Sequence, residues 1–149
     1  MGDVAASPTM VLSATWNPLD FISVSAALTT ATKRANGSFL TLGTSLGLPI
    51  YGKLNASVEL TAELADRNYA QTYCGVTAAQ SVRSEHRELR PKAGLISTSA
   101  SVGLHYEWTK EWSLGASLGT TRLQCDAAKS PIFSQRTEPN ASLFASYAY

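Results

Sequence analysis

Residues 53–64 read KLNASVELTAEL, and this stretch decides the fold. Apolar side chains occupy every second position from Leu54 to Leu64, while polar side chains from Asn55 to Glu63 occupy the positions between. Successive side chains of a strand point to opposite faces, so this period of two predicts a β-strand rather than a helix. One face of the strand is apolar and the other is polar.

The same alternation recurs along the chain and predicts an all-β protein. The seven predicted strands are 9–16, 20–32, 38–48, 53–64, 94–107, 111–123 and 139–149. Leucine, valine, alanine and aromatic residues share one face, whereas serine, threonine, glycine and asparagine dominate the other. A strand of about ten residues, rising ~3.3 Å per residue and tilted by ~40°, crosses the ~25 Å apolar band of an outer membrane.

The predicted connections alternate between short and long. Short turns lie at 17–19, 49–52 and 109–110, and long loops lie at 33–37, 65–92 and 124–138. Antiparallel strands place these two sets at opposite ends of the sheet. We therefore predict an antiparallel up-and-down transmembrane β-barrel, with short periplasmic turns and long extracellular loops. A structureless segment as long as 65–92 is unusual in a compact soluble domain but ordinary on the outer side of a barrel.

Bulk composition is compatible with one such domain over residues 1–149. The net charge is +1 and 15% of residues are charged, so we expect no nucleic-acid partner. No run reaches the roughly 18–20 apolar residues of a membrane helix, and alternation explains the mean hydropathy of −0.04. Residues 1–10, MGDVAASPTM, do not resemble a secretory signal, so we expect a removed signal or a partial chain.

Catalytic and cofactor motifs are not found in the sequence. It contains no Gly-rich phosphate loop, zinc-ligand spacing or nucleophile elbow, and neither Cys74 nor Cys125 belongs to a CxxC pair. We therefore expect no metal site, no cofactor and no enzymatic activity.

Aromatic residues gather near the short-turn end of the predicted strands. They are Tyr51, Trp108, Trp112, Tyr147 and Tyr149, with Trp16 as a further candidate. Their rings are apolar while their N–H and O–H groups favour water, which predicts an aromatic girdle at the membrane interface.

The polar face carries four titratable residues, namely Glu59, Glu63, His105 and Glu107. We predict that they point into the barrel lumen and join a hydrogen-bond network there. An acid/base pair for hydrolysis is disfavoured, because no activated nucleophile or water-excluding cleft is indicated nearby.

Charged residues cluster at the predicted outer rim. They are Asp66, Arg67, Arg83, Arg87, Arg90, Arg122 and Asp126. Three interpretations stay open: ion pairs that order the loops, contacts with lipopolysaccharide phosphates or a partner, and a simply solvated rim, in which exposed pairs contribute little.

Cys74 and Cys125 both lie in long loops on this side. One hypothesis is a disulfide that ties these loops together, since closing a ~50-residue loop stabilises by roughly 4 kcal/mol on the chain-entropy model. The alternative is two free thiols that lie too far apart to meet.

Three gapped segments carry a family resemblance. The first runs from ADRNY at 65–69 through YCGVTAAQSVRS at 73–84. The second is RPKAGL at 90–95, followed by YEWTKEWSLGASLG at 106–119. The third is Arg122-Leu123 with DAAKSPI at 126–132. In this order and spacing, residues 38–149 resemble the C-terminal part of the MipA/OmpV family of MltA-interacting outer-membrane proteins.

The resemblance implies a bacterial outer-membrane barrel whose role is structural and not enzymatic. Some family members are described as scaffolds between a lytic murein transglycosylase and a murein synthase, others as surface antigens or adhesins. Members are longer, with additional N-terminal strands, and single-chain bacterial barrels usually have an even strand number. We therefore expect a partial barrel of about seven strands, or eight, that forms the C-terminal portion of a larger one.

The resemblance also implies that the final strand is read by the outer-membrane insertion machinery. Its apolar face presents Leu143, Ala145, Tyr147 and Tyr149. Outer-membrane lipid, this machinery and the murein enzymes are the expected partners. Two other hypotheses stay open: a passive pore or adhesin built on the same barrel, and a soluble β-sandwich or lipocalin-like binding protein.

Overall fold

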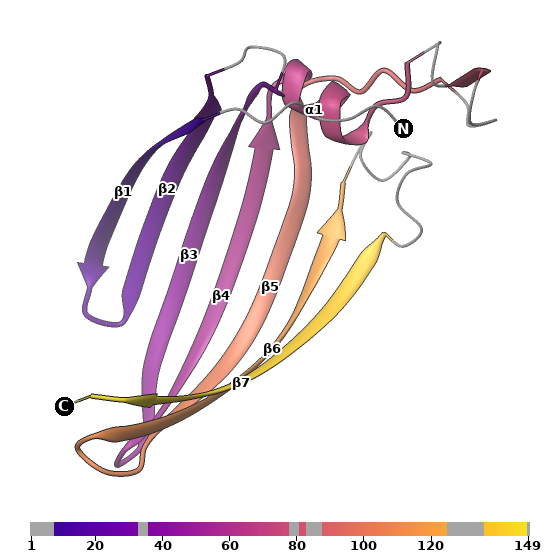
Figure 1. The fold of residues 1–149 in the computed structure, drawn as a ribbon. Coiled ribbons are helices and arrows are strands. Elements are labelled where there is room, and N and C mark those ends of the chain that lie inside the picture. The colour runs from indigo at the N-terminus through magenta and orange to yellow at the C-terminus, as the bar shows by residue number, and fades with distance from the viewer. Residues whose placement is uncertain (1–7, 33–35, 78–80, 83–87, 125–135, 149) are drawn as a thin grey trace.

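The computed structural model describes residues 8–32, 36–77, 81–82, 88–124 and 136–148 (Figure 1). Seven strands form one sheet, and each pairs antiparallel with the next along the chain. The elements are β1 (Thr9–Leu19), β2 (Ile22–Ala31), β3 (Ser38–Tyr51), β4 (Leu54–Ala65), α1 (Arg67–Cys74), β5 (Gly94–Glu107), β6 (Trp112–Leu123) and β7 (Thr137–Tyr147). The predicted all-β, up-and-down architecture is confirmed.

The strand register keeps the two faces of the sheet chemically separate. Leu46 of β3 lies beside Val58 of β4, which lies beside Val102 of β5. One position along, Ser45 lies beside Glu59, and Glu59 beside Ser101. A slip of one residue in any pair would place polar residues in the apolar rows, so the alternation excludes such slips.

The apolar face is the exposed one. Leu118 is 63% exposed and Leu143 is 86% exposed, whereas Ser97 on the polar face is only 5% exposed. Soluble proteins cover an apolar sheet face with a second layer, and they rarely leave a contiguous apolar patch of this kind bare. Within the described residues no second layer covers this face, as expected for the predicted barrel.

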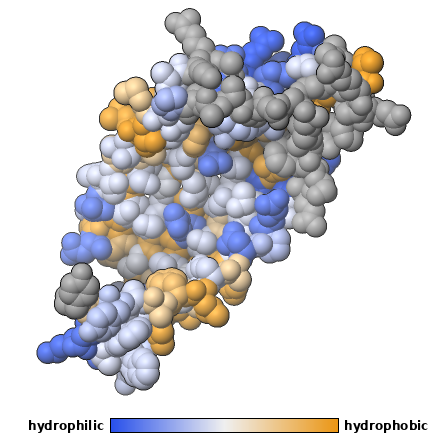
Figure 2. Space-filling model, in the orientation of Figure 1, coloured by the Kyte–Doolittle hydropathy of each residue, from blue (hydrophilic) through white to orange (hydrophobic). Residues whose placement is uncertain are grey.

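The sheet is curved (Figure 1), and the polar face is the less exposed of its two faces. Along β6, Ser113, Ser117 and Thr121 are less exposed than Leu114 and Leu118, as expected on a concave side. In the same view, pale and blue side chains cover the middle of the sheet (Figure 2). Small residues permit this curvature: a Cβ added at Gly103 would lie 2.7 Å from the Ser57 Oγ.

β1 and β7 are the two edges of the sheet, and their described residues are not paired with each other. An odd number of antiparallel strands makes β1 and β7 run in the same direction, so pairing them would create a parallel seam. A barrel that is antiparallel at every seam needs an odd number of further strands. The open sheet is thus consistent with the expected partial barrel.

Near three prolines, the observed strand boundaries differ from the predicted ones. β1 continues past Pro18 to Leu19, so the turn lies at Asp20–Phe21 rather than at 17–19. β3 continues past Pro49, where the register shifts, and the predicted turn at 49–52 narrows to Gly52–Lys53. β7 includes Pro139 and begins at Thr137. Proline is tolerated on edge strands and at bulges, where no ladder N–H is needed, so these prolines do not end the strands.

The long segment 65–92 is not wholly irregular, and that prediction was wrong for its first part. It contains α1, and Val76 pairs with Leu89 in an isolated antiparallel bridge. No helix in the described ranges is long and apolar enough to span a bilayer.

A small buried core lies at this end of the molecule rather than on either face of the sheet. Its buried residues include Ala65, Ala70, Cys74, Val76 and Pro91. In Figure 1, α1 sits across the loop end of the strands. The long-loop end therefore carries a packed unit of its own.

A matched pair of substitutions in β4 tests whether the exposed apolar face contacts lipid. Val58→Arg places a cation midway along the strand on the leucine face, whereas the neighbouring Ser57→Arg places it on the polar face. In lipid vesicles we expect Val58→Arg to lower the free energy of unfolding by ~2–4 kcal/mol and Ser57→Arg by less than ~1 kcal/mol. Equal losses, measured by urea titration of the vesicle-embedded protein, would contradict a lipid-facing leucine surface.

Candidate binding site at the loop end of the sheet

Asp66 fixes the start of α1 and ties the helix to β3. Its Oδ1 accepts a hydrogen bond from the Tyr69 N–H at 2.7 Å, and its Oδ2 accepts one from the Ser38 N–H at 3.0 Å. The Asp66 N–H in turn donates to the Ser38 carbonyl at 2.9 Å. One carboxylate thus acts as the helix N-cap and as a bridge between two elements.

Aromatic contacts hold the same helix against the sheet. The Tyr69 ring lies 4.9 Å from the Phe39 ring and 4.4 Å from the Tyr73 ring, measured between centroids. Gly37, at φ +69°, directly precedes β3 and lets the start of this strand lie against α1. A Cβ at Gly37 would clash with the Tyr69 backbone and with Asp66. Burial, followed by the charge of the Glu63 carboxylate, raises the pKa of Tyr69.

The site lies between two segments: α1 forms one side, and the segment around residues 88–91 forms the other. The Val76 N–H donates to the Leu89 carbonyl at 2.9 Å, and the Leu89 N–H donates to the Val76 carbonyl at 3.0 Å. Gly75 adopts an extended conformation after α1, and a Cβ there would clash with the Gln71 side chain. These contacts place Arg90 beside the helix.

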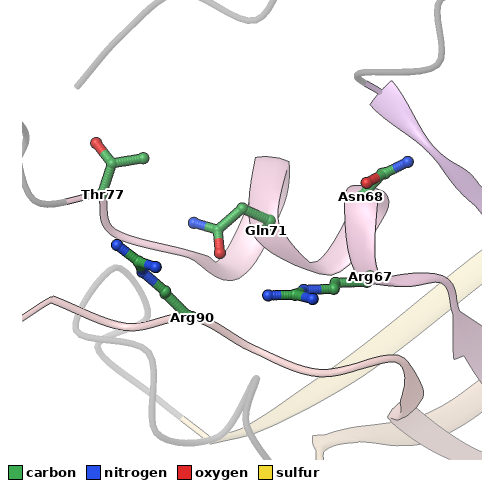
Figure 3. Close-up of a pocket in the computed structure, with 5 residues that line it drawn as sticks. All are labelled: Arg67, Asn68, Gln71, Thr77 and Arg90. Atoms are coloured by element: carbon green, nitrogen blue, oxygen red, sulfur yellow. The ribbon is translucent and has the colours of Figure 1, made fainter.

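A pocket lies between these walls (Figure 3). Its volume is about 290 Å³, and it is lined by Arg67, Asn68, Gln71, Thr77 and Arg90. Arg67 and Gln71 are four residues apart, so they share one face of α1. Of the described residues, two with guanidinium groups and none with a carboxylate line the pocket, which favours an anionic ligand over a cation.

The predicted rim charges have several different environments. Asp66 caps the helix by accepting from the Tyr69 N–H, and Arg67 lines the pocket with Arg90. In the described ranges an ion pair joins Arg90 Nε to Glu88 Oε1 at 2.6 Å. Arg122 lies near the end of β6, beside Thr98 and Thr137. Arg83, Arg87 and Asp126 lie outside the described residues.

The predicted lumenal residues share the polar face. The Ser97 Oγ donates to the Glu63 carboxylate at 2.6 Å, and the His105 ring stacks on Phe144 with 6.2 Å between centroids. Glu59 and Glu107 are exposed and lie beside small polar residues in the register.

Hydroxyl pairs make most of the remaining side-chain contacts on this face. They join Ser23 to Ser45, Ser99 to Thr121, Ser113 to Ser146, and Ser117 to Ser142. These are short cross-strand contacts rather than a linked acid/base array. The described residues hold no group of three or more side chains arranged to bind a metal ion.

The aromatic residues of the predicted girdle lie at the short-turn end. Tyr51 is 85% exposed, Trp108 is exposed in the β5–β6 turn, and the Trp112 and Tyr147 rings lie 5.1 Å apart. The girdle stays a prediction, and Tyr149 lies outside the described residues.

β7 presents Leu143, Ala145 and Tyr147 on the exposed apolar face, in register with β6. Its other edge has no strand beside it among the described residues. Recognition of this strand by the insertion machinery stays a prediction, since it depends on a partner.

Cys74 is buried at the end of α1 and has no disulfide partner among the described residues. Burial raises the pKa of this thiol. Cys125 lies outside the described residues, so the proposed disulfide stays a prediction. Alkylation of both thiols in the unreduced protein would rule it out.

Two features of the structure were not predicted from the sequence. The pocket residues Asn68, Gln71 and Thr77 were not singled out, although Asp66 before an eight-residue segment is a recognisable N-cap signal. Phe144 departs from the alternation, because its ring lies on the polar face over Gly115, where a Cβ would clash with it. A glycine directly opposite an aromatic residue was the available signal for this contact.

Comparison with known proteins identifies the family of the chain. The family model described as "MltA-interacting protein MipA" matches residues 1–149, the whole chain. No curated protein and no solved structure matches the chain.

The double role of Asp66 generates a stability prediction. Asp66→Ala removes the N-cap and the bond to Ser38, whereas Asp66→Asn keeps an oxygen that can accept from the Tyr69 N–H. We expect Asp66→Ala to destabilise α1 by about 1–2 kcal/mol and Asp66→Asn to have a smaller effect. Hydrogen exchange of the α1 amides measures this directly. Unchanged exchange in Asp66→Ala would contradict the capping role.

The raised pKa of Cys74 generates a pH prediction. The fold favours the neutral thiol, so its stabilising contribution is complete below the ordinary pKa of 9.0 and is lost as pH rises through the higher folded value. In a Cys125→Ser background, we expect folded protein to react with iodoacetamide more slowly than urea-unfolded protein, with its rate profile displaced to higher pH. Coincident profiles would show that the thiol is not shielded.

Proposed function

Because the chain belongs to the MipA family of outer-membrane proteins, we propose that it is a structural outer-membrane barrel component that binds a murein transglycosylase. The observation that carries this proposal is the match of the whole chain to a family described as MltA-interacting. The proposed role is binding and not catalysis. A murein synthase, held together with the transglycosylase, is a second proposed partner.

We propose that the leucine face contacts outer-membrane lipid, with the short turns in the periplasm and the long loops outside. The separation of apolar and polar faces supports this placement, because lipid solvates the apolar rows without a protein layer. The exposed aromatic residues at the short-turn end support the same orientation, since Trp and Tyr favour the headgroup region. The barrel-insertion machinery would recognise the apolar face of β7.

The short turns are the proposed contact surface for the periplasmic enzyme. In the β5–β6 turn, the Thr109 Oγ1 accepts hydrogen bonds from the Glu111 and Trp112 N–H groups at 3.2 and 3.0 Å. The Lys53 Nζ lies 3.4 Å from the Trp108 carbonyl and links this turn to the β3–β4 turn. The turns therefore present charged side chains on an ordered backbone, which suits recognition by charge complementarity.

A passive pore is the second candidate. The polar concave face supports it, because a completed barrel with this face inside would enclose a polar lumen. Conductance of the protein in planar bilayers separates the two candidates. Steady ion conductance without enzyme binding would favour the pore.

The scaffold proposal is tested by capture of purified lytic murein transglycosylase on the detergent-solubilised, immobilised protein. We expect saturable capture by the unmodified chain, and a decrease of roughly fivefold to tenfold in affinity for the Lys53→Glu/Lys110→Glu variant, since rim charges tune association.

The matched control is Arg122→Glu/Arg136→Glu, which reverses two charges at the opposite end of the sheet. We expect it to capture the enzyme as the unmodified chain does. No capture by the unmodified chain would contradict the scaffold role, and equal losses in both variants would contradict recognition by the short turns.

A further inference from the structure

We propose that the pocket between α1 and residues 88–91 binds the phosphoryl group of an anionic ligand. Arg67 lines the pocket from the helix and Arg90 from the opposite wall, with the Arg90 guanidinium on the Thr77 side and the Arg67 guanidinium on the other side of Gln71 (Figure 3). Guanidinium groups match phosphate oxygens in charge and in their forked geometry. This proposal requires only the loop-end pocket and is independent of the transglycosylase contact at the short turns.

The charge of the lining supports an anion. Among the described residues, no ion pair joins the Arg67 side chain to a carboxylate, so its positive charge is not neutralised there. Arg90 meets Glu88 through its Nε, and Glu88 itself does not line the pocket. The Nη atoms are the groups of Arg90 that we assign to the ligand. The side-chain exposure of 69% leaves this guanidinium accessible from solvent.

Neutral polar groups complete the site. Gln71 lies between the two arginines, and its amide supplies N–H donors toward phosphate oxygens (Figure 3). The pocket volume of about 290 Å³ lies just below the usual range of ligand-site volumes, ~300–1,000 Å³. It therefore suits a phosphorylated headgroup or a small free phosphate better than a larger organic molecule.

Contacts within the protein hold the backbone on both sides of the pocket without a ligand. Asp66 holds the first turn of α1, and the Val76–Leu89 bridge holds the far wall. Pro91, directly after Arg90, is fully buried. Preorganisation of this kind reduces the entropy lost on binding, and it distinguishes the pocket from an ordinary solvated charge on a loop.

Two sources carry the same phosphoryl chemistry, namely the phosphorylated glycolipid of the outer leaflet and free phosphate in solution. The test uses the full chain in a non-ionic detergent and isothermal titration calorimetry. The probes are diphosphoryl lipid A, the same lipid A after enzymatic dephosphorylation, and inorganic pyrophosphate. Binding of diphosphoryl lipid A but not pyrophosphate identifies the lipid source, and binding of pyrophosphate alone identifies a soluble one.

The variant Arg67→Gln/Arg90→Gln removes both guanidinium groups. We expect its affinity for the bound probe to fall by roughly tenfold or more, because charge-assisted hydrogen bonds dominate such sites. The matched control, Arg122→Gln/Arg136→Gln, removes two charges from the same end of the sheet outside the pocket. We expect less than a ~2-fold change for this control at a fixed, physiological ionic strength.

Arg67→Lys/Arg90→Lys keeps the charge and removes the forked geometry, so we expect intermediate affinity. Circular dichroism of each variant in the same detergent establishes that the sheet is retained. Equal affinity of the pocket and control variants would overturn the proposal, as would equal binding of dephosphorylated lipid A. Failure of the unmodified chain to bind either phosphorylated probe would also overturn it, and would leave the transglycosylase capture unaffected.

Discussion

The structure depends on the separation of apolar and polar side chains onto opposite faces of a single sheet. Seven antiparallel strands keep this separation in register, and the apolar face has no protein layer over it among the described residues. In water such a surface would associate or collapse, whereas in a bilayer the hydrocarbon chains solvate it. The polar hydroxyl pairs and the small residues on the concave side are the corresponding adaptation to a curved interior.

The two ends of the sheet differ in how they are built. At the loop end, Asp66, Tyr69 and the buried Pro91 organise a helix and a pocket. At the other end, short turns with exposed Trp108 and Tyr51 present a thin charged and aromatic rim. This asymmetry agrees with the two proposals, which place a phosphorylated ligand at one end and a periplasmic protein at the other.

Period-two alternation was enough to predict the strands, because the pleat fixes which residues share a face. Strand ends were less predictable, since Pro18 and Pro49 lie at an edge and a bulge, where proline is tolerated. The pocket was not predictable, because Arg67 and Arg90 are brought together only when α1 and the Val76–Leu89 bridge fold. Phe144 was not singled out for a related reason: alternation alone places this aromatic residue on the polar face, and its contacts with Gly115 and His105 depend on the pairing of β7 with β6 and β5.

The most direct measurement of the central claim compares the surroundings of two adjacent β6 residues in a bilayer. Spin labels are attached to Leu118→Cys and, separately, to Ser117→Cys, with both native cysteines replaced, and relaxation by oxygen and by a water-soluble nickel complex is recorded. A lipid-facing leucine surface predicts that the label at 118 responds to oxygen and the label at 117 to nickel. Nickel access at 118, or shielding of 118 from both reagents in detergent-free buffer, would contradict it.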